Sequence, residues 1–232
     1  MPADADSPIT MPLPATRVPR FASAAASAVT VLACTAALAW VQFSYDGLLD
    51  GDSYFHTRAA RELDRQGVQR EFPQTAFSTW RERYSDKDFL FHLLLIPFQR
   101  LHAPPADANN AVDAESAALV RSGKQAAVVF DLLVLAALAL ALHLVGARFA
   151  PIWLLLFMST HGAYLMYLLP VRPHMLGFAL LILEVALLMR GAFWWVIVLG
   201  VLHTWAHSSF FLLPVAGVIL AGARFLRSEP LP

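Results

Sequence analysis

Long runs of apolar residues constrain the fold of this chain more strongly than any other feature of its sequence. A helix needs about 20 consecutive apolar residues to cross a bilayer, and runs of this kind recur from residue 21 onward. The composition agrees, because 58% of the 232 residues are hydrophobic and 15% are charged, whereas soluble domains have about 25% charged residues. The sequence therefore predicts an all-α, multi-pass helical membrane protein with about six spans.

The predicted spans follow the apolar runs and are separated by short polar turns. The last run, at 193–225, is interrupted by HTWAHSS and predicts two short spans or half-spans, with one long tilted helix as the alternative. The other predicted spans cover residues 21–45, 125–145, 150–169 and 174–189.

The first span divides the chain into a tail and a membrane domain. Residues 1–19 hold five prolines and scattered polar residues, which predicts a disordered cytoplasmic tail. The apolar run at 21–45 is longer than the about 7–15 residues of a cleavable signal, so we expect an uncleaved anchor. Residues 20–232 then form one transmembrane domain, with a large outer loop at 46–124 that contains interfacial helices.

Basic residues orient the predicted spans, because they accumulate in short cytoplasmic loops. With the N-terminus in the cytoplasm, four basic segments fall on the inner side and the loop 46–124 lies outside. We therefore expect an integral protein of the bacterial inner (plasma) membrane. A net charge of zero without a basic tract indicates no nucleic-acid partner. The inner basic residues are Arg17, Arg20, Arg148, Arg190, Arg224 and Arg227.

The predicted outer loop contains two heptads that share the pattern Asp-x-Asp-x-x-Phe-His, at 50–56 (DGDSYFH) and 86–92 (DKDFLFH). On a helix that begins near Asp52, His56 lies one turn later on the same face. Carboxylates and an imidazole can bind Mg²⁺ or Mn²⁺, and a carboxylate can instead act as a general base. Two helix caps with interfacial histidines are the alternative. The predicted metal ligands are Asp52, Asp86, Asp88 and His56.

Each heptad is also expected to begin a helix. Asp50 or Asp52 caps the first helix, which continues to Gln66 and stops at Gly67. Asp88 caps the apolar run FLFHLLLIPF, which is too short to span a bilayer and predicts an interfacial or re-entrant helix.

Further polar residues lie near the outer ends of the predicted spans. Arg172 is a basic residue in an outer turn, against the general orientation, and a guanidinium can bind a phosphate through two hydrogen bonds. Arg172 and His174 form the predicted phosphate site, and a polar helix end among aromatic residues is the alternative. The other candidates at this side are His161, His203 and His207.

Two ionisable residues fall within predicted spans, where such groups are costly and face protein or a water-filled cavity. Asp131 is close enough to the outer side to join the outer site. Glu184 lies deeper, and we expect it to pair with Arg190 or with a polar group of a lipid.

The stretch GDSYFHTRAARELDRQG at 51–67 resembles the first outer-loop motif of the GT-C glycosyltransferase superfamily, and most of all that of oligosaccharyltransferase catalytic subunits. Those enzymes share the pattern Asp-x-Tyr-x-His/Asn-x-Arg. The resemblance covers the first span and its loop, and the topology with a cytoplasmic N-terminus and a large outer loop agrees with it. The matching residues here are Asp52, Tyr54, His56 and Arg58.

The resemblance implies transfer of a sugar from a polyprenyl-phosphate donor at the outer membrane face. Asp52, with Asp50 as a second candidate, takes the catalytic position near the acceptor or the metal ion, and Arg172 and His174 take the donor phosphate. Oligosaccharyltransferases have a second acidic motif between the third and fourth spans, where this chain reads LLPVRPH without an acidic residue. Such enzymes also have more spans, so we expect an N-terminal portion or one subunit of an assembly.

Two classes of function therefore follow from the sequence. The first is a GT-C glycosyltransferase that uses a polyprenyl-phosphate sugar. The second is a non-catalytic membrane protein with the same fold, which binds a lipid carrier or a partner subunit through the same loop.

Overall fold

The computed structural model describes residues 20–71, 77–104, 110–160 and 166–227. The predicted tail at 1–19 and the candidate residue His161 lie outside the described residues. Within the described ranges the chain is helical and contains no strand, which confirms the all-α prediction.

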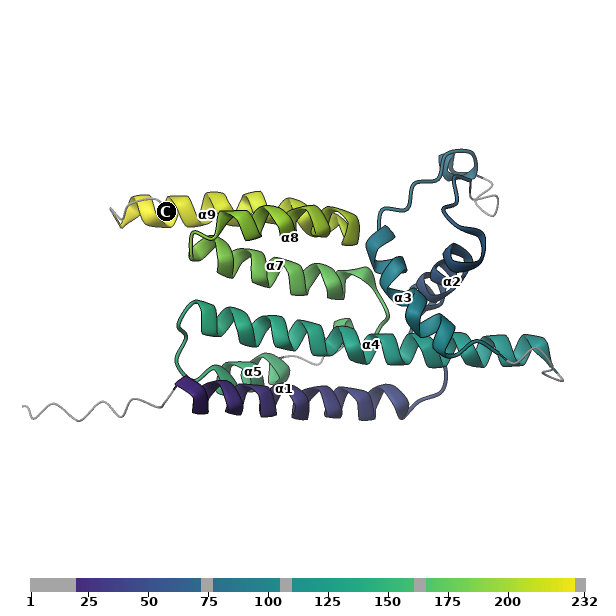
Figure 1. Ribbon diagram of the computed structural model, residues 1–232, viewed down its shortest axis with the longest axis horizontal. Coiled ribbons are helices and arrows are strands. Elements are labelled where there is room, and N and C mark those ends of the chain that lie inside the picture. The colour runs from purple at the N-terminus through teal and green to yellow at the C-terminus, as the bar shows by residue number, and fades with distance from the viewer. Residues whose placement is uncertain (1–19, 72–76, 105–109, 161–165, 228–232) are drawn as a thin grey trace, which may run out of the picture.

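The long helices lie side by side along the longest axis of the molecule (Figure 1). Within the described residues, three helical segments are long and apolar enough to cross a membrane, namely Ala22–Phe43, Ala111–Leu144 and Ser208–Leu226. These segments are compatible with the predicted membrane protein. The helices of the bundle are α1 (Arg20–Phe43), α4 (Ala111–Leu144), α5 (Ala150–Ser159), α7 (Pro173–Met189), α8 (Phe193–Ala206) and α9 (Leu212–Leu226).

The helix α4 differs from the predicted span at 125–145, because it begins at Ala111 and has 34 residues. At 1.5 Å per residue it is about 51 Å long, whereas the hydrocarbon core of a bilayer is about 30 Å thick. Its first turns extend past the other helices of the bundle (Figure 1). Residues 111–124, which are predicted to lie in the outer loop 46–124, are thus helical and continuous with the predicted span.

The remaining spans agree with the helices to different degrees. The predicted span 150–169 contains α5 only up to Ser159, and residues 161–165 lie outside the described residues. The predicted helix at 174–189 is α7, with Pro173 in its first turn, where a missing N–H is tolerated. The predicted break in the last run is confirmed, because His207 is extended and separates α8 from the short η2 (Ser208–Phe211) and α9.

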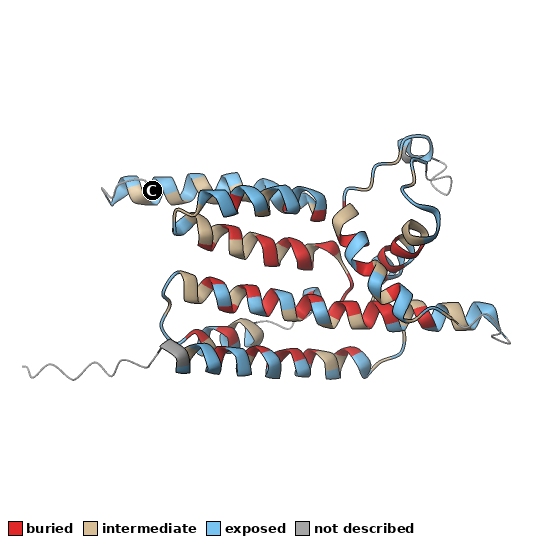
Figure 2. Cartoon of the chain, in the orientation of Figure 1, coloured by how far each residue is buried: buried red, intermediate tan, exposed pale blue. Residues whose placement is uncertain are grey.

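The core of the bundle lies around α4, which packs against α1 and α7. Red buried positions follow the facing sides of these helices (Figure 2). Leu135 of α4, Leu38 of α1 and Met175 of α7 are examples, each 0–2% exposed. By contrast, none of the described residues of α9 is buried. Helices in lipid associate through close packing, so α1, α4 and α7 form the tightly packed part of the bundle.

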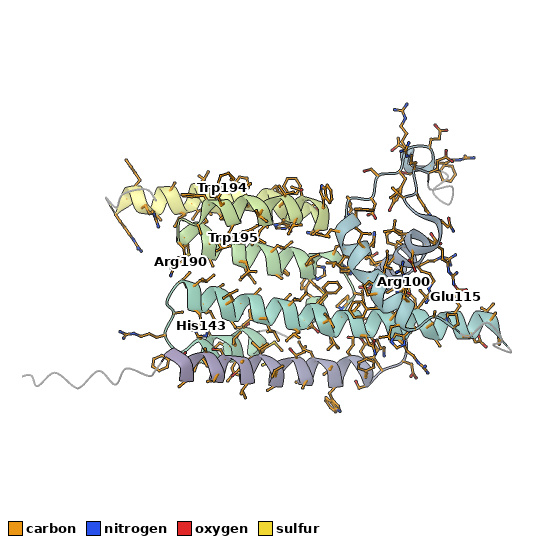
Figure 3. All side chains as sticks on the ribbon, viewed as in Figure 1. Arg100, Glu115, His143, Arg190, Trp194 and Trp195 are labelled. Carbon is orange, nitrogen blue, oxygen red and sulfur yellow. The ribbon has the colours of Figure 1, made fainter. Side chains whose placement is uncertain are left out.

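Arginines gather at one end of the bundle, at the C-termini of its helices. Arg190 donates from Nη1 to the carbonyl of Leu144 over 2.9 Å, and Arg224 donates from Nη2 to the carbonyl of Met189 over 3.2 Å. Such contacts satisfy terminal carbonyls and complement the negative end of the helix dipole. Arg190 and Arg224, two of the arginines assigned to the cytoplasmic side, thus lie at the same end of the molecule, which Arg190 marks in Figure 3.

The opposite end carries α2 (Gly51–Gln66), the short η1 (Thr79–Arg81) and α3 (Phe89–Leu101). Asp50 is the N-cap of α2, and Gly67 ends it with a φ of 75°, a conformation that glycine adopts without strain. Arg61 of α2 joins both neighbouring helices, because it donates to Gln99 of α3 and to Glu115 of α4. Both predicted loop helices are present, and they pack on the extended part of α4.

A chain of polar side chains is buried between α7, α8 and η2. Nδ1 of His203 lies 3.0 Å from Oε2 of Glu184, and both side chains are fully buried. Nε2 of His203 and Nδ1 of His207 each lie 2.8 Å from Oγ of Ser209. The expected pairing of Glu184 with Arg190 was wrong, because the carboxylate of Glu184 contacts His203 of the next helix, and Arg190 donates to the carbonyl of Leu144.

Gly177 of α7 allows this polar chain to approach, and we predict that Gly177→Ala destabilises the bundle. A Cβ atom there would lie 2.8 Å from Oγ of Ser209 and 3.1 Å from Cβ of His207. Overpacking of this kind costs about 1–3 kcal/mol. Thermal unfolding of the detergent-solubilised protein measures the effect.

The matched control is Gly222→Ala in α9, where a Cβ would meet nothing within 4 Å. Gly222→Ala is expected to leave the thermal unfolding midpoint unchanged or to raise it, because alanine favours a helical conformation more than glycine does. Equal midpoints for the two variants would contradict the packing described for Gly177.

Candidate functional site

The two acidic heptads lie next to each other at the end of the bundle that carries α2 and α3. The first heptad leads into α2 and the second into α3, and these helices pack together. Their contact is made by the histidines, since Nδ1 of His56 lies 2.9 Å from Nε2 of His92. The heptads therefore meet through their imidazole rings.

The first aspartate of the first heptad stabilises the start of α2. Oδ1 of Asp50 accepts the backbone N–H of Ser53 over 2.8 Å and its hydroxyl over 2.7 Å. Oδ2 of Asp50 lies 2.6 Å from Nη2 of Arg172. Burial by itself raises the pKa of Asp50, but the bonds from Ser53 and the pairing with Arg172 outweigh it and lower this pKa. Asp50 is thus an ionised helix cap with a fixed set of partners.

Asp52 lies beside the same guanidinium but is much more accessible. Its Oδ2 is 3.1 Å from Nη2 of Arg172, and 65% of its side chain is exposed. The position of Arg172 follows from Val171, whose N–H donates to Oγ of Ser53 over 2.9 Å. The structure therefore brings together Asp50, Asp52 and Arg172, three of the residues predicted from the sequence, and leaves Asp52 open to a ligand.

The second heptad supplies a carboxylate to the histidine pair. Oδ2 of Asp86 lies 2.6 Å from Nδ1 of His92, whose side chain is only 1% exposed. Burial lowers the pKa of His56 to about 3; the neighbouring His92, Lys87 and Arg172 act in the same direction, while Asp86 opposes them. His56 is therefore neutral in the folded protein at neutral pH.

Asp88 is an N-cap of α3 by position, but its side chain does not cap the helix. It is 3% exposed, and its Oδ2 lies 3.0 Å from Nζ of Lys87. Its Oδ1 has no hydrogen-bond partner within the described part of the chain. The expected side-chain cap at Asp88 is thus replaced by an ion pair with the preceding residue.

The four predicted metal ligands are held by different partners. Asp52 contacts Arg172, Asp86 contacts His92, Asp88 contacts Lys87, and His56 contacts His92. Across the described ranges, no three His, Cys, Asp or Glu side chains form a group that could hold one metal ion. Because Arg172 takes the carboxylate oxygens of Asp50 and Asp52, a divalent cation at these oxygens would compete with its guanidinium.

The two residues of the predicted phosphate site, Arg172 and His174, are also held by different partners. His174 donates from Nε2 to the carbonyl of Tyr167 over 2.7 Å, and its ring lies edge-to-face against Tyr167 and Phe178. Nη2 of Arg172 contacts two carboxylates, while its Nε is buried without a partner among the described residues. Arg172 is thus the member of this pair whose charge faces the site.

The other residues of the resemblance motif have structural contacts. The hydroxyl of Tyr54 accepts the backbone N–H of Leu48 over 3.0 Å, and Arg58 pairs with Glu62 over 2.9 Å on the exposed side of α2. Asp131 is 1% exposed, and both its carboxylate oxygens lack a hydrogen-bond partner within the described residues. Within the described residues, Asp131 thus has no hydrogen bond to the residues of the outer site that it was predicted to join.

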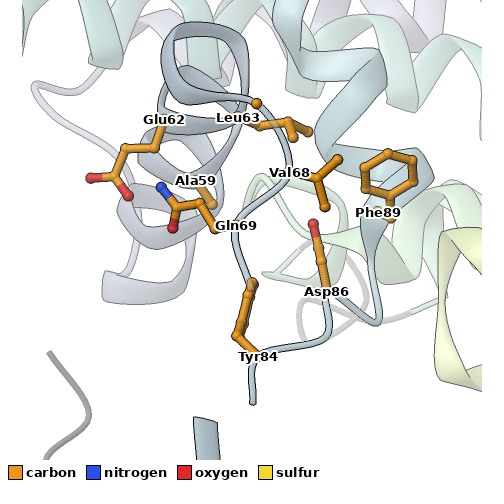
Figure 4. Close-up of a pocket in the computed structure, with 9 residues that line it drawn as sticks. Ala59, Glu62, Leu63, Val68, Gln69, Tyr84, Asp86 and Phe89 are labelled. Carbon is orange, nitrogen blue, oxygen red and sulfur yellow. The ribbon is translucent and has the colours of Figure 1, made fainter. Parts of the chain in front are cut away.

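A surface pocket opens beside the second heptad (Figure 4). Ala59, Glu62 and Leu63 of α2 line one side of it, while Tyr84 and Asp86 come from the segment before α3. Burial, with Asp86 nearby, raises the pKa of Tyr84 to about 12. The pocket was not predicted from the sequence, and Asp86 is one of the residues that line it.

Comparison of the chain with models of protein families, with curated proteins and with solved structures gives no match.

Acidification is expected to destabilise the protein through His56. The ordinary pKa of His56 is 6.5, and its pKa in the folded protein is about 3. At a pH between these two values, His56 carries a proton in the unfolded chain but not in the folded chain. Stability is therefore lost as the pH falls below 6.5, by about 2 kcal/mol between pH 7.5 and pH 5. Thermal unfolding midpoints of wild type and His56→Gln across this range measure the effect.

The unfolding midpoint of His56→Gln should depend less on pH than that of wild type. His102→Gln, at the end of α3, is the control, and its midpoint should depend on pH as in wild type. If all three proteins lose stability equally, the neutral state of His56 is wrong.

Removal of the Arg172 guanidinium tests whether the carboxylates of Asp50 and Asp52 can bind a divalent cation. We expect Arg172→Gln to bind Mn²⁺ more tightly than wild type, because the oxygens of Asp50 and Asp52 then lose their cationic partner. Electron paramagnetic resonance of free Mn²⁺ measures the binding, and adding Asp52→Asn should reverse the gain. If Mn²⁺ binds neither protein, these carboxylates do not form a cation site.

Proposed function

We propose that this chain is a GT-C-type membrane glycosyltransferase, or the N-terminal part of one, that transfers a sugar from a polyprenyl-phosphate donor. In this proposal it crosses the bacterial inner (plasma) membrane with about six spans, and its N-terminus is cytoplasmic. The site lies at the outer face, where α2 and α3 rest at the membrane interface and surrounding lipid supplies the donor.

The observation that carries the proposal is the exposed carboxylate of Asp52 next to Arg172 at one end of an apolar helix bundle. The side chain of Asp52 is 65% exposed and that of Arg172 is 34% exposed, so both can reach a ligand. A transfer from a phosphate donor needs a group that contacts the acceptor and a cation near the leaving phosphate. Asp52 and Arg172 supply these two groups within one contact.

The distribution of charge supports the proposed orientation. Arg190 and Arg224 lie at the helix ends opposite to the site, as expected of residues on the cytoplasmic side. The site end carries the acidic residues of both heptads. A lipid-linked donor would then approach Arg172 from the bilayer, and a polar acceptor would approach from water.

The contact between Asp52 and Arg172 can change when a donor binds. Asp52 is held at 3.1 Å, whereas Asp50 is held at 2.6 Å and also binds Ser53. A donor phosphate that binds the guanidinium therefore displaces Asp52 more easily than Asp50. Asp52 then faces the acceptor, Asp50 keeps the helix cap, and His174 supports the turn that carries Arg172.

A second candidate is a non-catalytic protein of the same fold that binds a lipid carrier or a partner subunit. The apolar surface of α8 and α9 favours it, since Trp194 is 80% exposed (Figure 3) and no described residue of α9 is buried. Such a surface contacts either lipid or further helices. This candidate predicts that the protein binds a polyprenyl phosphate but does not transfer a sugar.

Asp52→Asn tests the proposed function. With a polyprenyl-phosphate sugar in the membrane, we expect it to lower the rate of sugar transfer by about 10²–10⁴-fold, because the acceptor then loses the carboxylate that contacts it during proton transfer. Release of polyprenyl phosphate measures the rate. The fold should be retained, since the cap residue is Asp50.

The matched control is Asp46→Asn, which changes an exposed carboxylate shortly before the same helix. It is expected to keep the wild-type rate. Full activity in Asp52→Asn would exclude Asp52 as the catalytic carboxylate, and binding without transfer by the wild type would favour the non-catalytic candidate.

A further inference from the structure

Three side chains from the two heptads form a continuous hydrogen-bonded row. Oδ2 of Asp86 lies 2.6 Å from Nδ1 of His92, and Nε2 of His92 lies 2.9 Å from Nδ1 of His56. His92 in the middle is almost fully buried, while Asp86 and His56 at the two ends are 16% and 8% exposed. The row thus runs through the interior of the α2–α3 pair.

The positions of the protons in this row follow from what each group can donate. A carboxylate accepts hydrogen bonds, so Nδ1 of His92 carries the proton that Asp86 accepts. The bond between the two rings needs one donor and one acceptor, and Nε2 of His92 is the acceptor when Nδ1 carries the only proton of that ring. Nδ1 of His56 must then donate to His92. The remaining nitrogen, Nε2 of His56, has no hydrogen-bond partner within the described residues and bears a lone pair.

We propose that Asp86, His92 and His56 form a proton relay that accepts the proton of an acceptor hydroxyl group. The proposal rests on the proposed function and adds the chemical class of the acceptor, an alcohol such as a sugar or a hydroxyl side chain. His56 is the catalytic residue of the relay, because its Nε2 touches the hydroxyl. His92 and Asp86 act through it and are positioning residues.

The relay moves one proton and leaves neither histidine charged. As the acceptor oxygen forms its bond to the anomeric carbon, its proton passes to Nε2 of His56. Nδ1 of His56 passes a proton to Nε2 of His92, and Nδ1 of His92 passes one to Asp86, which becomes a carboxylic acid. The bond from the anomeric carbon to the phosphate oxygen breaks, and its electron pair leaves with the polyprenyl phosphate.

This path accounts for a histidine that is difficult to protonate. Lys87 and Arg172 both disfavour a positive charge on His56, so a base that had to store the proton on His56 would be weak. In the relay the proton does not stay there. Asp86, at the far end, lines the pocket of Figure 4, and from this pocket the proton leaves to solvent.

Asp52 and His56 have complementary roles in this arrangement. They lie four residues apart on α2, so they share one face of the helix. Asp52 is paired with Arg172 through Oδ2, which leaves Oδ1 to accept a hydrogen bond from the acceptor hydroxyl. Asp52 therefore orients the hydroxyl by accepting a hydrogen bond before transfer, and His56 receives the proton.

Nitrogen-15 NMR of the full chain in detergent micelles at neutral pH tests the relay without any substrate. We expect His56 and His92 both to carry their proton on Nδ1. His174 is an internal reference, because its Nε2 donates to the carbonyl of Tyr167. Histidine-to-glutamine variants assign the signals. A doubly protonated His92, or a proton on Nε2 of His56, overturns the relay.

An activity measurement then separates the relay from the proposed function. His92→Gln should lower kcat for transfer to an alcohol by about 10²-fold or more, with little change in KM and with an altered pH profile. His102→Gln, at the C-cap of α3 and outside the row, should match wild type. Absence of transfer in wild type contradicts the proposed function, whereas equal kcat for the two variants contradicts the relay alone.

Discussion

The start of α2 is the contact on which the geometry of the site depends. Ser53 donates two hydrogen bonds to Asp50, and its hydroxyl oxygen accepts the N–H of Val171, 118 residues later in the chain. Ser53 is fully buried, so none of these three bonds competes with water. Because Arg172 follows Val171 directly, this helix cap places the guanidinium beside Asp50 and Asp52. The charge of the site is therefore a consequence of local helix capping.

The helices were predictable where local signals are strong. An aspartate cap with a glycine stop predicts α2, and the polar interruption at 203–209 predicts the break between α8 and α9. The start of α4 was not predictable in the same way, because Ala111–Lys124 mixes charged and small residues and is not apolar. Hydropathy identifies the part of a helix that suits lipid, whereas good helix formers such as alanine and glutamate extend the helix beyond it.

The residues of the candidate site were predictable as a set, but their partners were not. The repeated heptad indicated Asp86, Asp88 and His92, yet spacing alone suggested carboxylates around one cation. Partners depend on side chains that meet only in the folded chain, such as Arg172 with Asp52 and His203 with Glu184. An interfacial position was the alternative for His92, and its burial between His56 and Asp86 could be learned only from the packing of α3 on α2.

The uninterrupted length of α4 has a mechanical consequence. The helix contacts Ser27 of α1 through His143 near one end and Arg61 of α2 through Glu115 near the other. These contacts are about 42 Å apart along the axis at 1.5 Å per residue, and no proline interrupts the helix between them. A stiff rod of this kind transmits a tilt at one end to the other. The orientation of the α2–α3 pair is thus coupled to the arginine-bearing end of the bundle, and with it to the thickness of any bilayer that surrounds α4.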